Sequence, residues 1–170
     1  MSARVLPFDY VEGQLRKKHF GIIGTVTPDG RSHTTAIVYG VSAPEAPLAL
    51  YVLTEAGYKK TRNIRANPNV SFVITFPHHL LRFVPASCIQ FQGCAEVLPG
   101  DDPDARAAFQ RNQVLRMTLE QGASDPERAV FLKITPDAKI FGYGLGMSLI
   151  ALRRNIEAGP FVTTVPAGRL

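Results

Sequence analysis

The sequence predicts a mainly β (α+β) protein, folded as an antiparallel Greek-key barrel of about six to seven strands with a few flanking helices. Runs rich in β-branched residues follow one another as three strands, a helix, two strands, a helix and two strands. This order differs from the regular strand–helix alternation of a parallel sheet. A Thr-Pro-Asp-Gly turn at residues 27–30 also reverses the chain between the first two strands. The 170 residues, 45% of them hydrophobic, predict one domain over residues 1–170.

Four predicted strands lie in the first half of the chain. A polar helix at residues 10–18 precedes a strand at 20–27, and a second strand at 32–41 alternates between two faces. Residues 48–54 are apolar on both faces, so we expect one face to meet the barrel interior and the other a helix, a subunit or a ligand. Residues 55–66 predict a short helix, which Asn67-Pro68 ends before a strand at 70–76.

The second half of the chain contains the strand with the clearest two-faced pattern, at residues 87–98. One face carries Cys88, Gln90, Gln92 and Cys94, and the other carries Ile89, Phe91, Ala95 and Val97. Asp102 is the predicted N-cap of a helix that has Pro103 in its first position and runs to about residue 121. The last two predicted strands are residues 129–135 and 139–143.

Cysteine use and hydropathy indicate a cytoplasmic protein without a metal site. Cys88 and Cys94 fall in one strand about 20 Å apart, at roughly 3.3 Å per residue, which a disulfide cannot bridge. No apolar run approaches the roughly 20 residues that span a bilayer. His78 and His79 are adjacent in a loop, and no nearby Cys or carboxylate has ligand-like spacing.

A basic segment at residues 58–63 predicts an anion site. Lys59 and Lys60 fall in the first turn of the short helix, where the helix dipole disfavours each cation by about 0.3–1 kcal/mol. A phosphate at that helix N-terminus would remove the mismatch, and Gly57 would let the backbone approach it. The alternative is that these lysines, with Arg62 and Arg65, form the solvated face of a surface helix.

The net charge of +5 leaves the acidic partner open among a phosphate, a nucleotide and a polynucleotide. A barrel that binds single strands interleaves exposed aromatic and basic residues on its strands. Here the basic residues concentrate in helices and loops. We therefore expect a small-molecule ligand, with no nucleic acid and no membrane partner.

Three stretches together resemble the pyridoxamine 5'-phosphate oxidase-like, FMN-binding split-barrel superfamily. Residues 24–36 (GTVTPDGRSHTTA) are similar to its opening hairpin. Residues 54–70 (TEAGYKKTRNIRANPNV) are similar to its phosphate-binding strand-to-helix segment. Residues 89–97 (IQFQGCAEV) are similar to its later G-x-A strand. The order and spacing of these stretches carry the resemblance, which implies a split β-barrel and a homodimer with the cofactor between subunits.

The resemblance also implies roles for particular residues. Lys60 and then Lys59 are the expected phosphate contacts, beside Tyr58, where the family often has a small hydroxyl residue. The isoalloxazine ring of FMN is expected to border four residues of the second strand, and the ribityl chain two residues of the third. These six residues are His33, Thr34, Thr35, Ala36, Leu53 and Thr54. Gln90 or Gln92 of the second subunit is expected to reach the ring or the phosphate.

The function implied is an FMN-dependent oxidoreductase acting on an unidentified small molecule, and it leaves catalytic residues unassigned because a flavin transfers hydride itself. The alternatives are a reductase that uses the deazaflavin coenzyme F420, and a non-catalytic flavin- or haem-binding protein. The longer anionic tail of F420 favours further basic residues, for which the candidates are Arg16, Lys17, Lys18 and Arg31. Pyridoxamine phosphate oxidase activity itself is disfavoured, because the chain lacks the arginine-rich C-terminal substrate segment and contains no Trp.

Overall fold

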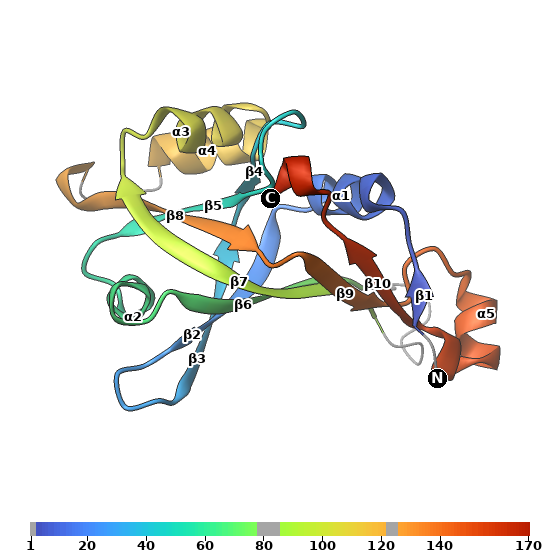
Figure 1. Cartoon of the computed structure of the whole chain (residues 1–170). Coiled ribbons are helices and arrows are strands. Elements are labelled where there is room, and N and C mark those ends of the chain that lie inside the picture. Colours follow the sequence, from blue (N-terminus) through green and yellow to red (C-terminus); the bar gives the residue numbers. More distant parts are fainter. Residues whose placement is uncertain (1–2, 78–85, 122–125) are drawn as a thin grey trace.

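The computed structural model describes residues 3–77, 86–121 and 126–170, which form one strongly curled sheet with flanking helices (Figure 1). The strands are β1 (Arg4–Val5), β2 (Phe20–Val26), β3 (Ser32–Val38), β4 (Gly40–Val41), β5 (Leu50–Glu55), β6 (Asn69–Phe76), β7 (Ser87–Pro99), β8 (Ala129–Pro136), β9 (Lys139–Tyr143) and β10 (Pro160–Thr164). The α-helices are α1 (Phe8–Lys17), α2 (Lys59–Ala66), α3 (Pro103–Gln110), α4 (Gln113–Gln121) and α5 (Leu149–Arg154).

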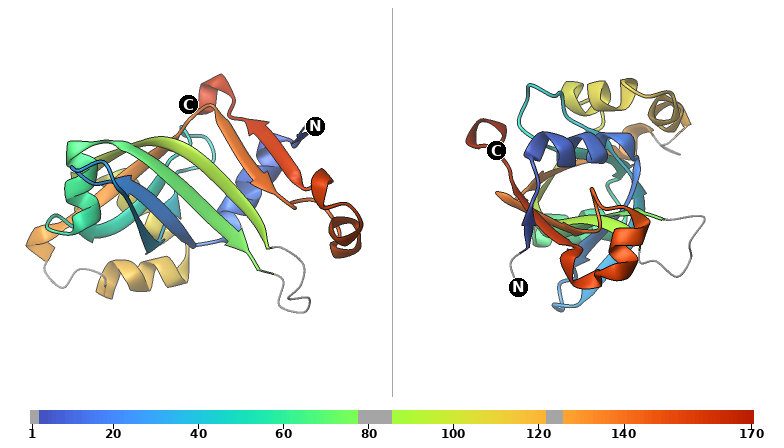
Figure 2. Two further views of the ribbon diagram at one scale, coloured as in Figure 1. Left: turned by 90° about the horizontal axis from the view of Figure 1, so that it is seen from below. Right: turned by 90° about the vertical axis from the view of Figure 1, so that its right-hand side faces the viewer.

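The long strand β7 organises the sheet. Along one edge it pairs with β6, and along the other it pairs with β9 near its start and with β8 near its end. One arm of the sheet then runs β6, β2, β3, and the opposite edge divides into β9–β10–β1 and β8–β5–β4. Because one strand serves two diverging arms, the sheet curls into the split barrel that the sequence predicts (Figure 2).

Two hydrophobic clusters cover the two sides of the curled sheet. The larger fills the barrel interior, where Phe72 stacks on Phe91 with ring centroids 5.4 Å apart and meets Tyr39 edge-on. Helix α1 contributes Val11 and Leu15 to this cluster. The smaller cluster lies beneath α3 and α4 and includes Tyr51, Phe109 and Phe131. The two apolar faces of β5 are therefore both covered, the outer one by helices, as the sequence predicts.

The predicted turn and the two-faced strand are confirmed. The N–H of Gly30 donates to the carbonyl of Thr27 at 2.8 Å, which closes the hairpin between β2 and β3. On β7, Ile89 and Phe91 are buried while Gln90 and Gln92 are exposed. Both cysteines are free thiols.

The single helix predicted over residues 102–121 is wrong, because the chain forms α3 and α4 with a break at Arg111 and Asn112. Asp102 caps α3 as expected and accepts the N–H of Ala105. The carbonyl oxygen of the Asn112 side chain accepts the N–H of Val114 at 2.8 Å and so starts a second helix.

Three strands were missing from the sequence prediction of six to seven. β10 pairs with β9 and carries buried Phe161 and Thr163, and the two-residue β1 pairs with β10 in parallel. The predicted second strand also divides at Tyr39 into β3 and β4. Before Tyr39 the strand β3 pairs with β2, and after it the strand β4 pairs with β5. The phenol of Tyr39 donates to the carbonyl of Leu15 at 2.9 Å, which holds this crossing against α1.

No helix in the described ranges is long and apolar enough to cross a membrane. His78 and His79, for which the sequence predicts a loop without a metal site, lie outside the described residues.

Candidate functional site

The predicted anion site falls at the N-terminus of α2, and the two lysines lie in its first turn as the sequence predicts. Lys59 and Lys60 are its first two residues, and its first turn contains no acidic residue. Tyr58, in the N-cap position, makes no side-chain cap hydrogen bond. The first N–H groups of a helix have no partner within the helix, so this end presents N–H groups and two ammonium groups together.

Lys60 is more enclosed than Lys59. Its ammonium lies 4.8 Å from the centre of the Tyr58 ring, a cation–π contact, while Lys59 is exposed. Burial lowers the pKa of Lys60 below the ordinary lysine value, and the nearby Glu55 acts in the opposite, weaker direction. An anion beside Lys60 would restore the favourable environment that burial removes, since an opposite charge stabilises the ammonium form.

A chain of hydrogen bonds ties α2 to the hairpin of β2 and β3. The side-chain amide of Asn63 donates to the hydroxyl of Thr25 at 2.9 Å, and that hydroxyl donates to the carbonyl of His33 at 3.2 Å. Asn63 and Thr25 are each 2% exposed. At the start of the helix, the hydroxyl of Thr61 donates to the carbonyl of Glu55 at 2.8 Å. The lysine-bearing turn is thus fixed to the strand that carries His33.

Two predicted site residues hold buried polar atoms that have no hydrogen-bond partner among the residues that the structure describes. They are Nδ1 of His33 and the hydroxyl oxygen of Thr54, which is the last residue but one of β5. Buried polar groups in folded proteins nearly always have partners, and an exception calls for an explanation. Polar atoms that await a ligand would explain both, so the residues fit a polar cofactor.

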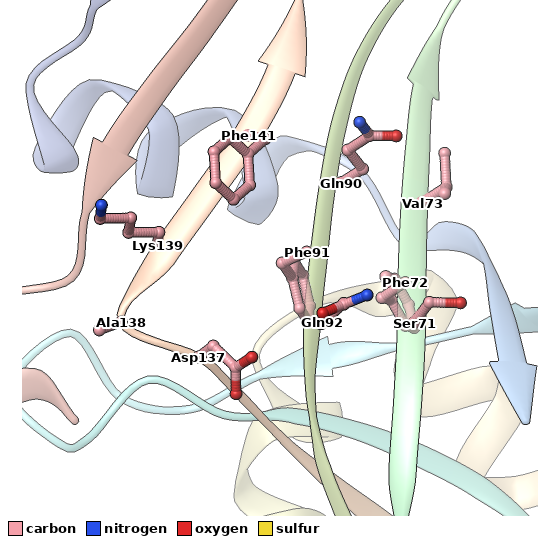
Figure 3. Close-up of a pocket in the computed structure, with 10 residues that line it drawn as sticks. All are labelled: Ser71, Phe72, Val73, Gln90, Phe91, Gln92, Asp137, Ala138, Lys139 and Phe141. Atoms are coloured by element: carbon pink, nitrogen blue, oxygen red, sulfur yellow. The ribbon is translucent and has the colours of Figure 1, made fainter.

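A second part of the site lies on the outer face of the sheet. Gln90 lies between Phe141 of β9 and Val73 of β6, and the three line an open groove of ≈ 760 Å³ together with Gln92 and Asp137 (Figure 3). An adjoining groove of ≈ 380 Å³ is lined by Thr34, Ser71, Gln92 and Cys94, among others. None of the residues that line the two grooves belongs to α2.

The predicted site residues therefore divide into two groups. Tyr58, Lys59, Lys60, His33 and Thr54 belong to the α2 end of the barrel or to the buried polar atoms beside it. On β3, alternate side chains face opposite ways, so Thr34 and Ala36 are exposed on the outer face while His33 and Thr35 are half-buried. Thr34, Gln90 and Gln92 meet at the two grooves.

Leu53 has a packing role, since its side chain joins the cluster beneath α3 and α4. Arg16, a candidate for a longer anionic tail, binds the carboxylate of Glu12 and donates to the carbonyl of Ser42 at 2.7 Å. The side chains of Leu53 and Arg16 therefore have contacts within the fold itself.

Sequence reasoning did not assign a role to Asn63, Thr25, Ser71, Asp137 or Phe141. For Asn63 a signal existed, because Asn is a poor residue for a helix interior and more often serves a specific hydrogen bond. The others had no local signal, because their part in the site arises from pairing between strands far apart in the sequence.

Comparison with known proteins gives one family match. The model of the pyridoxamine 5'-phosphate oxidase family matches residues 9–139, from α1 to the first residue of β9. No curated protein sequence matches the chain.

Solved structures with the same fold carry different descriptions. A conserved hypothetical protein from Mycobacterium tuberculosis is 20% identical, with a TM-score of 0.60 over 80% of this chain and 84% of that one. A haem-binding protein from Mycobacterium smegmatis is 19% identical, with a TM-score of 0.65 over 94% of this chain and 59% of that one. An F420 reductase is 21% identical, with a TM-score of 0.57 over 79% of this chain and 98% of that one.

Similarity at these identities supports the fold alone, whereas the family match spans most of the chain, from the first helix to the ninth strand. The chain belongs to the pyridoxamine 5'-phosphate oxidase family.

Proposed function

We propose that this protein is an FMN-binding oxidoreductase that acts on a small molecule and works as a homodimer. The main observation in support is the N-terminus of α2. Lys59 and Lys60 lie there, and this helix end has neither an acidic residue nor a side-chain cap. Such an end suits a terminal phosphate, which accepts backbone N–H groups and ammonium protons together.

The protein's own residues would hold and orient the cofactor. Lys60 and the first N–H groups of α2 bind the phosphate, and the hydrogen bonds from Asn63 through Thr25 fix that turn relative to β3. His33 and Thr54 supply polar atoms that are buried and unpartnered. A bound flavin supplies the hydride or electron transfer, so the site requires orientation and exclusion of water more than an acid–base pair.

The outer face of the sheet supports the homodimer. Three large apolar side chains on strands of this sheet are exposed to solvent. Phe141 is 46% exposed, Ile22 is 40% exposed and Phe20 is 60% exposed. A contiguous exposed apolar face is typical of an interface. A second copy on this face would cover these residues and bring its own Gln90 and Gln92 to the boundary between subunits.

Among the cofactor alternatives, FMN agrees best with the cations that are available. A single terminal phosphate needs only the compact group at α2. Coenzyme F420 favours further cations. Of the four candidates, Arg16 is bound to Glu12, Arg31 pairs with Asp29 at 2.9 Å and Lys18 lies over the Phe76 ring, which leaves Lys17. Haem binding is the description of relatives such as the haem storage protein from Vibrio cholerae, which is 16% identical.

The test is spectroscopic. The purified protein is titrated separately with FMN, F420 and haem, and binding is followed by the change in absorbance and in flavin or deazaflavin fluorescence. We expect saturable FMN binding with one site per chain. Saturable binding of F420 or haem without FMN binding would contradict the proposal and identify the cofactor class instead.

A further inference from the structure

A small cavity lies between α3 and the sheet, apart from both grooves of the outer face. It has a volume of ≈ 280 Å³ and shares no lining residue with those grooves. Asp104, Ala107, Ala108 and Arg111 line one side at helical spacing along and just beyond α3. The loop between β4 and β5 forms another side of the cavity.

The floor of the cavity contains a tyrosine hydroxyl without a partner. Tyr51 of β5 is 4% exposed, and its hydroxyl makes no hydrogen bond within the described part of the chain. The hydroxyl oxygen is not one of the fully enclosed unpartnered atoms, so it opens into the cavity. Burial raises the pKa of the Tyr51 phenol above its ordinary value, so the group stays protonated and can donate. A ligand that accepts a hydrogen bond would complete it.

Charged groups of both signs surround this hydroxyl. Lys133, the cross-strand neighbour of Tyr51, bonds Glu96 at 3.0 Å and keeps two further N–H donors. Among the described residues, Arg111 and Asp104 have no hydrogen-bond or ion-pair partner. Three kinds of donor therefore line the cavity, from Tyr51, Lys133 and Arg111, together with the carboxylate of Asp104.

We propose that this cavity binds a small α-amino acid with an apolar side chain. The hydroxyl of Tyr51 and the cations of Lys133 and Arg111 receive the ligand carboxylate, and Asp104 receives its ammonium group. The side chain packs against the alanines and Pro47 of the lining. The volume falls just below the usual range of ligand pockets, about 300–1,000 Å³, which suits only a small metabolite and excludes a flavin.

The test uses the full-length protein labelled with ¹⁵N, without added flavin. Backbone amide shifts are followed in titrations with L-valine, with isobutyrate, which lacks the amine, and with isobutylamine, which lacks the carboxylate. We expect saturable shifts that centre on β5, β8 and α3 for L-valine, weaker binding of isobutyrate, and none of isobutylamine.

Substitutions separate the roles of the groups. Tyr51→Phe and Arg111→Gln should each weaken L-valine binding about tenfold, since each removes a hydrogen bond to a charged group. Asp104→Asn should weaken L-valine and leave isobutyrate unchanged. The matched controls are Tyr10→Phe and Arg116→Gln, which lie outside the cavity.

The proposal is overturned if L-valine produces no saturable shifts, or if Tyr51→Phe and Arg111→Gln bind it as tightly as the controls. Arg111 is exposed, so its substitution keeps the test valid even where Tyr51→Phe disturbs packing. Because no flavin is present, failure of this site leaves the flavin proposal untouched.

Discussion

Replacing Lys60 by alanine tests the cofactor site most directly. Lys60 is half-buried at the N-terminus of α2. A phosphate there would stabilise the ammonium group, which burial has partly removed from water. A hydrogen bond to a charged group contributes roughly 1.5–3 kcal/mol, which corresponds to about a 10- to 150-fold increase in the Kd for FMN. Lys59 is exposed, so Lys59→Ala should raise the Kd by only about two- to fivefold.

The assay is fluorescence quenching of FMN on titration with each variant, at fixed ionic strength because surface charge is screened by salt. Arg116→Ala is the control, since it removes a positive charge from the exposed surface of α4, which carries none of the predicted site residues. If Lys60→Ala keeps its fold by circular dichroism and binds FMN as tightly as Arg116→Ala, the phosphate assignment is refuted.

The same site should respond to pH. Burial lowers the pKa of Lys60, so its ammonium is lost at a lower pH than that of an ordinary lysine. FMN affinity should therefore fall as the pH rises through this lowered pKa, before exposed lysines titrate. In Lys60→Ala this decrease should be absent. A parallel decrease in the wild type and in the variant would assign the pH dependence to another group.

Two further predictions concern the hydrogen bonds behind the site and the outer face of the sheet. Asn63→Ala leaves the hydroxyl of Thr25 without its donor in a buried position and should lower the free energy of unfolding by about 1–3 kcal/mol, measured by urea denaturation. The exposed Asn155→Ala, which removes only a hydrogen bond at the end of α5, is the control, and an equal loss in both would contradict a special role for Asn63. Phe141→Asp places a charge on the proposed interface and should convert the dimer to a monomer in light scattering, whereas Val114→Asp on α4 should not. A wild-type monomer, or a Phe141→Asp dimer, would refute the interface.

Local patterns allowed much of the fold and part of the site to be predicted from sequence. The Thr-Pro-Asp-Gly turn depends on adjacent residues, the two faces of β7 follow from the period of a strand, and the lysines of α2 conflict with a helix dipole only one turn away. These features require no knowledge of distant segments. The family resemblance depends on the same three stretches, and the family match confirms it.

The remaining features depended on tertiary structure. Asn63 and Thr25 are 38 positions apart, and no local pattern indicates that their side chains meet. The helical pattern of residues 103–121 is broken at Asn112, because the cap hydrogen bond of its side chain favours the start of a new helix. Strand β1 exists because β10, more than 150 residues later, provides an edge for it to pair with. The outer-face grooves arise where β9, β7 and β6 come side by side. The sequence alone thus determined the lysine-rich N-terminus of α2, whereas only the pairing of distant strands decided which side chains surround it and which face of the sheet stays exposed.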